Sequence, residues 1–185
     1  MKKVKGYIER KNHALEYGDY TMSHIQGCAD GCKCPCYAFM MKKRFGQIKF
    51  MRNGWSPIWC QIHLNCWTRK FLGWQKKIKS VQLCFSTDPF MYQYSEIQSM
   101  SLASIKKLNE AGIKCSVLTK CIFPIELAEF SKENEYGITL ITTNESFRKR
   151  IESGSVPLKE RLDSLRATTR CRLHYMGKHW VVSNT

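Results

Sequence analysis

From residue 80 onwards, short apolar runs alternate with segments that carry helix signals. The runs lie at 81–86, 115–119 and 136–143, and each is typical of a buried strand. Helices are expected over 95–111, 124–134, 145–153 and 157–167. Because parallel strands need a crossover between them, usually a helix, this alternation predicts an α/β fold with a parallel sheet and right-handed crossovers.

The length of the chain narrows the architecture. The sequence has 185 residues, whereas a complete eight-stranded (β/α) barrel usually needs about 250. Two arrangements therefore stay open, an open doubly wound sheet and part of a (β/α) barrel. Both bind ligands at the carboxyl ends of their strands, so the residues directly after each strand are the informative ones.

The first part of the chain is less regular. Residues 1–20 are polar and Lys-rich and are expected to form a basic N-terminal arm, with the main domain spanning 21–185. Within that domain, a short strand is expected over 21–27, a helix closed by Gly46 over 37–46, and a second helix over 56–71.

The end of the chain offers one more candidate strand, KHWVVS at 178–183. No helix follows it, and the stretch before it lacks a helical apolar stripe. A strand in this position is expected to leave an exposed sheet edge if it pairs at all. Residues 168–185 are therefore expected to be poorly packed.

The net charge is +15 and lies mostly in the first part of the chain. Residues 1–80 contain 16 Lys and Arg against 4 Asp and Glu, a net charge of +12. A basic region of this kind suits a polyanionic partner such as nucleic acid, or it is a solvated surface that keeps the protein in solution.

The sequence shows neither a membrane span nor a secretory signal. No apolar run approaches the ~18 residues that a spanning helix needs, and the basic N-terminus is not followed by an apolar core. A cytoplasmic location is expected. In a reducing compartment, the ten cysteines favour metal binding or redox chemistry over disulfides.

Four of these cysteines, Cys28, Cys32, Cys34 and Cys36, lie within nine positions. Thiolates this close can hold zinc or an iron–sulfur cluster. Structural zinc sites usually combine two separate cysteine pairs, and no second pair is evident. One compact loop fits a cubane iron–sulfur cluster better.

The loop GCADGCKCPCYA (27–38) resembles the cluster loop of radical S-adenosylmethionine (radical SAM) proteins, in particular their spore-photoproduct-lyase-like or DNA repair photolyase-like branch. FSTDPF (85–90) is similar to the family's S-T-D-P segment, and LTKC (118–121) is similar to its L-T-K-G. Residues 137–165 resemble a G-x-T-L stretch followed by a Glu-Pro-Gly segment and a helix containing Glu-Arg. Together the resemblance covers roughly residues 20–166.

The sequence departs from the family at a few positions. The last gap between cluster ligands is one residue longer, Ser153 stands where the family usually has Pro, and Cys121 where it has Gly. The resemblance fades after about residue 167, which is expected of a member that is C-terminally truncated, shifted in reading frame near its end, or minimal.

The resemblance implies a partial (β/α) barrel with parallel strands, an incomplete TIM-type fold. It also implies a set of site residues. Cys28, Cys32 and Cys36 would ligate a [4Fe–4S] cluster, with Cys34 as a rival to Cys36. S-adenosylmethionine would contact Ser86, Thr87, Asp88 and Lys120, while Tyr37 would pack beside the cluster.

The function that the resemblance implies is that of a lyase-like radical SAM enzyme. It would accept electrons from a donor, generate a 5′-deoxyadenosyl radical and act on nucleic acid bound through the basic 1–80 region. Two alternatives are a zinc-bound nucleic-acid-binding module that uses the same cysteines, and a non-catalytic remnant that still holds a cluster.

Overall fold

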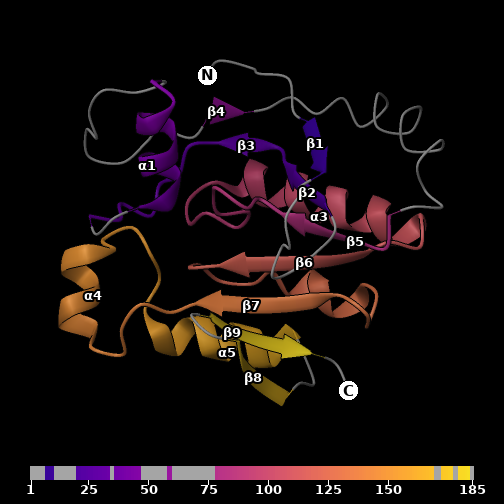
Figure 1. Cartoon of the computed structure of the whole chain (residues 1–185). Coiled ribbons are helices and arrows are strands. Elements are labelled where there is room, and N and C mark those ends of the chain that lie inside the picture. The colour runs from indigo at the N-terminus through magenta and orange to yellow at the C-terminus, as the bar shows by residue number, and fades with distance from the viewer. Residues whose placement is uncertain are drawn as a thin grey trace.

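A seven-stranded sheet forms the centre of the molecule in the computed structural model (Figure 1). The structure describes residues 7–10, 20–33, 36–46, 58–59, 78–168, 172–176 and 179–183. The strands of this sheet are β1 (Tyr7–Arg10), β2 (Tyr20–Ser23), β5 (Ser80–Leu83), β6 (Lys114–Thr119), β7 (Glu135–Thr139), β8 (Arg172–Met176) and β9 (His179–Ser183). A separate pair contains β3 (Ile25–Gln26) and β4 (Ile58–Trp59).

The strand order is β1-β2-β5-β6-β7-β9-β8. The four strands β2, β5, β6 and β7 run parallel to one another. At the two ends of this group, β1 pairs antiparallel with β2, and β9 pairs antiparallel with β7. The predicted α/β fold with a parallel sheet is therefore confirmed.

The helices are α1 (Tyr37–Arg44), α3 (Ser95–Glu110), the 3-10 helix η2 (Ile125–Glu129), α4 (Glu145–Ile151) and α5 (Leu158–Thr168). Helix α3 connects β5 to β6 and packs against β6, while α5 packs against β7 and η2. Helices α1 and α4 lie beyond the carboxyl ends of β6 and β7 (Figure 1). In the described ranges, none of the helices is long and apolar enough to cross a bilayer.

The two faces of the parallel strands differ, because successive side chains point to opposite sides. Val81, Val117 and Ile138 share one face and belong to the apolar core. In the same core, the ring of Phe123 lies edge-on to those of Phe90 (5.7 Å) and Tyr136 (5.8 Å). The opposite face carries the buried polar side chains Thr21, Gln82 and Ser116, which are neighbours across three strands.

Two predicted helices differ in the structure. Ile58–Trp59, inside the helix expected over 56–71, is strand β4, whose β-branched and aromatic residues pair with β3; the rest of that segment lies outside the described residues. The helix expected over 124–134 is a 3-10 turn that ends at Glu129, because the backbone is extended at Phe130.

The C-terminal strand has a different place from the one expected. β9 pairs with β7 on one side and with β8 on the other, so β8 lies at the sheet edge. Only two residues separate β8 from β9, and a connection this short makes the pair antiparallel. The expectation that 168–185 is poorly packed concerns side chains that are mostly outside the described part, and it stays a prediction.

The N-terminal arm also contains regular structure. Four of its residues form β1, which pairs along its whole length with β2. The remaining residues before β2 lie outside the described part of the chain.

Candidate functional site

The cysteine loop is docked onto the carboxyl ends of the parallel strands. The backbone N–H of Gly154 donates to the carbonyl oxygen of Asp30 (2.9 Å), and Lys33 N–H donates to the carbonyl of Ile151 (2.7 Å). On the other side, the Thr87 hydroxyl donates to the carbonyl oxygen of Gly27. The loop is thus held by the segment after β5 and by the turn after α4.

Gly154 makes this close approach possible. A Cβ atom at this position would overlap the carbonyl oxygen of Ala29 and lie 2.9 Å from the carbonyl carbon of Asp30. Gly31 has a φ of +62°, which L side chains rarely adopt. Both glycines therefore serve the contact between the cysteine loop and residues 153–154.

Asp88 joins the turn after β5 to the end of β6. Its buried carboxylate accepts hydrogen bonds from the backbone N–H of Phe90 (2.8 Å), the Thr119 hydroxyl (2.6 Å) and the backbone N–H of Lys120 (2.7 Å). Burial raises the pKa of Asp88, and these three donors work against that shift. The S-T-D-P and L-T-K segments are therefore linked through one side chain.

His24 stabilises the same turn through contacts with Ser101 and Cys84. Its Nε2 lies 2.7 Å from the Ser101 hydroxyl, which donates to the carbonyl of Pro89 (2.6 Å). Its Nδ1 lies 3.4 Å from the sulfur of Cys84, a residue with a φ of +53°. Complete burial lowers the pKa of His24 to about 3, so the ring is neutral and can accept the Cys84 S–H.

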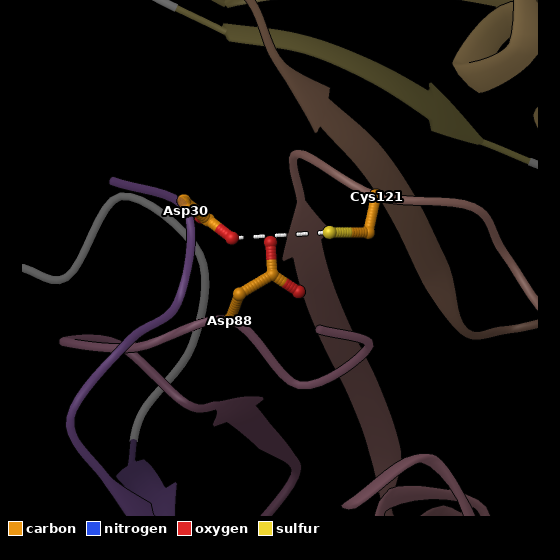
Figure 2. Close-up of side chains that lie close together, drawn as sticks. All are labelled: Asp30, Asp88 and Cys121. Atoms are coloured by element: carbon orange, nitrogen blue, oxygen red, sulfur yellow. Dashed lines mark hydrogen bonds between the residues drawn. The ribbon is translucent and has the colours of Figure 1, made fainter. Parts of the chain in front are cut away.

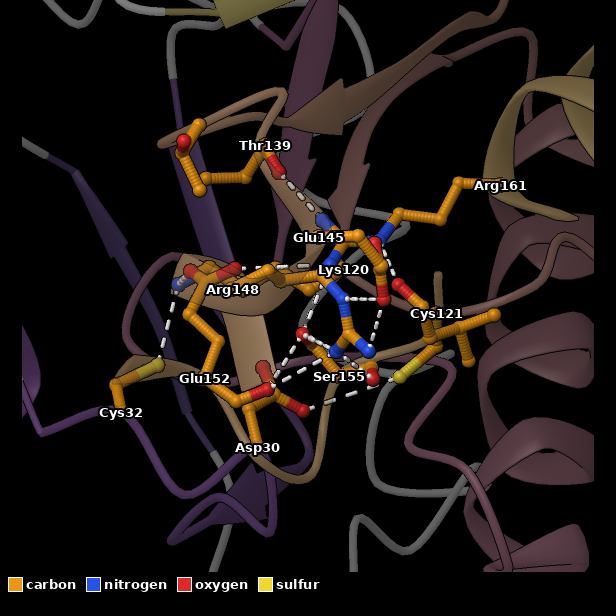
Figure 3. A network of polar contacts seen from close by, with 12 residues as sticks. Asp30, Cys32, Lys120, Cys121, Thr139, Glu145, Arg148, Glu152, Ser155 and Arg161 are labelled. Atoms are coloured by element: carbon orange, nitrogen blue, oxygen red, sulfur yellow. Dashed lines mark hydrogen bonds and ion pairs between the residues drawn. The ribbon is translucent and has the colours of Figure 1, made fainter. Parts of the chain in front are cut away.

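Lys120 connects the cysteine loop to the turn after α4 (Figure 3). Its Nζ donates to the sulfur of Cys32 (3.1 Å) and forms an ion pair with Glu152. Burial alone would lower the pKa of Lys120, but the neighbouring Cys32 sulfur and Glu152 carboxylate raise it above its usual value. The lysine is therefore a partly buried cation at the carboxyl end of β6.

Glu152 also faces a second cation. Its Oε2 lies 3.6 Å from Nη2 of Arg161, and each of these two side chains is only 1% exposed. The guanidinium donates to the carbonyls of Val156 (2.6 Å) and Thr139 (2.9 Å) and to the Ser155 hydroxyl (2.8 Å). Arg161 thus fixes the carboxylate to the end of β7. We call Lys120, Glu152 and Arg161 the charged cluster.

Arg148 holds the backbone of the same turn. Its Nη1 donates to the carbonyl oxygens of Ser155 (2.6 Å) and Glu152 (3.2 Å), while its Nε donates to Glu145 (2.6 Å). The turn that carries Glu152 and Gly154 is therefore fixed from both sides by arginines.

Asp30, Asp88 and Cys121 bring three potential metal-ligand atoms within 4.8 Å of one another (Figure 2). Burial, followed by the charge of Asp88, raises the pKa of Asp30 to about 7, and burial also raises that of the Cys121 thiol. The thiol donates to Asp30 (3.8 Å), and Asp88 already accepts three protein hydrogen bonds. Protein donors thus account for this group, and a metal ion would have to displace them.

The three predicted cluster ligands are free, half-buried cysteines, unlike the fully buried Cys84 and Cys115. Within the described ranges, the three sulfurs do not form a group in which all lie within 4.8 Å of one another. Around one zinc ion, with Zn–S of ~2.3 Å, sulfurs must come within roughly 4 Å. A cubane cluster binds each thiolate to a different iron, so it needs no such close group.

Within the described residues these cysteines do not form a preformed zinc site, and they offer the three thiols that a cubane cluster would need. Burial raises the pKa of both Cys28 and Cys32; Asp30 and Asp88 add to this at Cys28, whereas Lys120 works against it at Cys32. Both residues are thiols without metal and must lose a proton when a metal binds.

The other predicted site residues occupy different environments. Ser86 is exposed, Thr87 is half-buried, and Asp88 is buried beneath them. Tyr37 begins α1, but its side chain lies outside the described part, as does Cys34. Their proposed contacts with S-adenosylmethionine or with the cluster stay predictions.

Sequence reasoning assigned no role to Asp30, Glu152 or Arg161, although all three are buried at this edge. Glu152 and Arg161 belong to the Glu-x-Gly and Glu-Arg segments that were part of the resemblance. The similarity of these two segments to family motifs was the sequence signal for a role of Glu152 and Arg161. The structure adds a physical reason, because charged side chains buried this deeply require a partner.

Comparison of the chain with models of known families, with functionally characterised proteins and with solved structures finds no significant match.

Proposed function

We propose that the chain is a radical SAM iron–sulfur protein in which Cys28, Cys32 and Cys36 hold a [4Fe–4S] cluster. The observation that carries the proposal is that the segments similar to family motifs lie together in the fold. The cysteine loop, the S-T-D-P turn, the L-T-K turn and the Glu-x-Gly turn are far apart in sequence and meet at the carboxyl edge of one parallel sheet. This edge is where parallel α/β folds bind ligands.

When bound and reduced, the cluster supplies one electron for cleavage of S-adenosylmethionine to methionine and a 5′-deoxyadenosyl radical. The chain supplies position and shielding. Its three half-buried thiols would provide the ligands, and Ser86 and Thr87 are the hydroxyl residues assigned to S-adenosylmethionine. Asp88 and Lys120 complete the polar groups assigned to S-adenosylmethionine.

A nucleic-acid substrate is part of the same proposal. Exposed basic residues lie on α4 (Lys149 and Arg150) and at the end of α1 (Lys43 and Arg44), and both helices stand beyond the carboxyl ends of the strands (Figure 1). Phosphate groups bound there would release counterions, so the affinity for duplex DNA should fall as salt is added. A plot of log affinity against log salt concentration should have a slope of about −0.9 per phosphate contact. Absence of DNA and RNA binding at ~50 mM salt would remove this part of the proposal.

The proposal also includes an electron donor and a reducing, cytoplasmic location. The six cysteines Cys28, Cys32, Cys36, Cys84, Cys115 and Cys121 form no disulfide with one another, which agrees with reducing conditions.

The test is anaerobic reconstitution of the full chain with iron and sulfide. The expected product is brown, contains iron and sulfide, and forms 5′-deoxyadenosine from S-adenosylmethionine after reduction with dithionite. A colourless protein that contains zinc would support the zinc-binding alternative and contradict the proposal. A cluster that forms without cleavage of S-adenosylmethionine would identify a non-catalytic remnant.

The ligands are tested by substitution. Cys28→Ala, Cys32→Ala and Cys36→Ala should each abolish iron binding, because the thiolates are the protein's ligands. Cys34→Ala should retain iron, and Cys115→Ala, which removes a thiol buried in β6, is the matched control. Loss of iron in Cys34→Ala with retention in Cys36→Ala would move the third ligand to Cys34.

A further inference from the structure

One of the three proposed ligands has a cation in contact with its sulfur. Nζ of Lys120 lies 3.1 Å from Sγ of Cys32. We infer that Lys120 keeps this hydrogen bond when the cluster is bound and thereby raises the cluster's reduction potential. The inference rests on the proposed function, and it gives Lys120 a role toward the cluster itself in addition to the proposed contact with S-adenosylmethionine.

The structure fixes Lys120 at both ends. Its backbone N–H donates to Asp88 (2.7 Å), and its carbonyl accepts from the N–H of Val156 (3.1 Å). Its side chain, only 16% exposed, ends at the ion pair with Glu152. Because Glu152 is itself held by Arg161, the ammonium group cannot swing into solvent without breaking buried contacts. The lysine is therefore preorganised toward the sulfur.

The three ligands differ in their surroundings. Cys28 lies near the carboxylates of Asp30 and Asp88, whereas Cys32 has Lys120 as its closest charged partner. The carboxylates of Asp30 and Glu152 also act on Cys32, but Lys120 is the charged group that donates a hydrogen bond to its sulfur. The Asp30 carboxyl itself accepts a hydrogen bond from the Cys121 thiol.

This arrangement favours the reduced cluster for a simple electrostatic reason. Reduction adds one electron, and part of its charge resides on the ligating sulfurs. A hydrogen bond to such a sulfur stabilises the added charge, and hydrogen bonds to the sulfurs are among the factors that set cluster potentials. In a mostly buried site, the interaction is weakly screened by solvent.

The experiment measures the midpoint potential of the reconstituted cluster without S-adenosylmethionine, so that any contact of Lys120 with that molecule cannot contribute. Lys120→Met removes the cation, and Lys33→Met removes an exposed cation next to Cys32 in the chain and is the matched control. At the wild-type midpoint, Lys120→Met should show a ratio of reduced to oxidised cluster at least tenfold lower, a shift of about 59 mV for one electron. Lys120→Arg should restore most of the potential.

The outcomes separate the two proposals. A loaded Lys120→Met protein whose potential equals that of Lys33→Met overturns the inference and leaves the proposed function standing. A wild-type chain that holds no iron and sulfide overturns both. If Lys120→Met does not fold, Lys120→Gln keeps an N–H for Glu152 while removing the charge, and the same comparison decides.

Discussion

Two buried polar clusters lie at opposite ends of β6 and β7, and they are built from different chemistry. At the amino ends, the side chains of Asn109 and Asn134 exchange two hydrogen bonds (2.9 and 2.8 Å). Asn134 also accepts from the backbone N–H of Cys115 (2.8 Å) and donates to the hydroxyl of Tyr136 (2.9 Å). This amide cluster, Asn109 and Asn134, is neutral, and it joins the end of α3 to the starts of both strands.

At the carboxyl ends, the charged cluster contains two cations and one carboxylate and contacts a cysteine sulfur. Neutral, fully hydrogen-bonded groups add stability at modest cost, whereas buried ion pairs lose hydration that their attraction often fails to recover. Stability alone therefore explains the amide cluster and does not explain the charged one. Because a buried charged group that stability does not explain is a candidate for a functional role, the contrast supports the proposed placement of the site at the carboxyl ends of the strands.

Removal of the carboxylate from the charged cluster should have the largest effect. Glu152→Ala leaves Lys120 and Arg161 buried without their counter-charge, which should lower the free energy of unfolding by roughly 3–5 kcal/mol. Urea unfolding measures this change. Glu160→Ala, an exposed position in α5, is the control and should stay near the wild type. Equal stability of the two variants would show that the charged cluster is not a buried network.

Disruption of the amide cluster should lower the free energy of unfolding by less, and it should leave iron binding unchanged. Asn134→Ala removes the acceptor of the Cys115 N–H and both hydrogen bonds to Asn109, which should cost about 1–3 kcal/mol in the free energy of unfolding. Because this cluster lies at the other end of the strands, the folded variant should bind as much iron as the wild type. Loss of iron together with retained stability would contradict the functional contrast between the two ends.

The sequence was sufficient for the regular part of the fold. The apolar runs at 81–86 and 115–119 match β5 and β6, and the helix expected over 95–111 is α3 (Ser95–Glu110). Strands β1 and β8 were missed. β1 consists of YIER in a Lys-rich segment, so its pairing with β2 decides its conformation more than its own pattern does.

The candidate site was predictable only in part. Asp88, Lys120 and Cys32 were assigned through the resemblance of their segments to family motifs, and Lys120 directly follows β6 in the structure. The contact between Lys120 and Glu152 joins residues 32 positions apart in the sequence, and no local pattern encodes it. The contacts of Lys120 with Glu152 and Val156 depend on how the turn after α4 folds back toward β6. Tertiary packing determines this, not the local sequence.

The smallest effect on stability is expected for the ion pair of Lys114 and Glu135, which lies at the amino ends of β6 and β7 near the amide cluster. This pair tests whether burial or charge alone accounts for the large effect expected in the charged cluster. Lys114 Nζ lies 3.1 Å from Glu135, but the two side chains are 41% and 32% exposed. Exposed pairs of this kind typically contribute about 0.2–1 kcal/mol, because water and salt screen them. Lys114→Met should therefore change the free energy of unfolding by less than ~1 kcal/mol, and a double-mutant cycle with Glu135→Gln should give a coupling within that range. Added salt should weaken this coupling while leaving the Glu152→Ala effect nearly unchanged, because screening acts on exposed charges. A coupling as large as the loss in Glu152→Ala would mean that charge, irrespective of burial, stabilises both ends of the sheet.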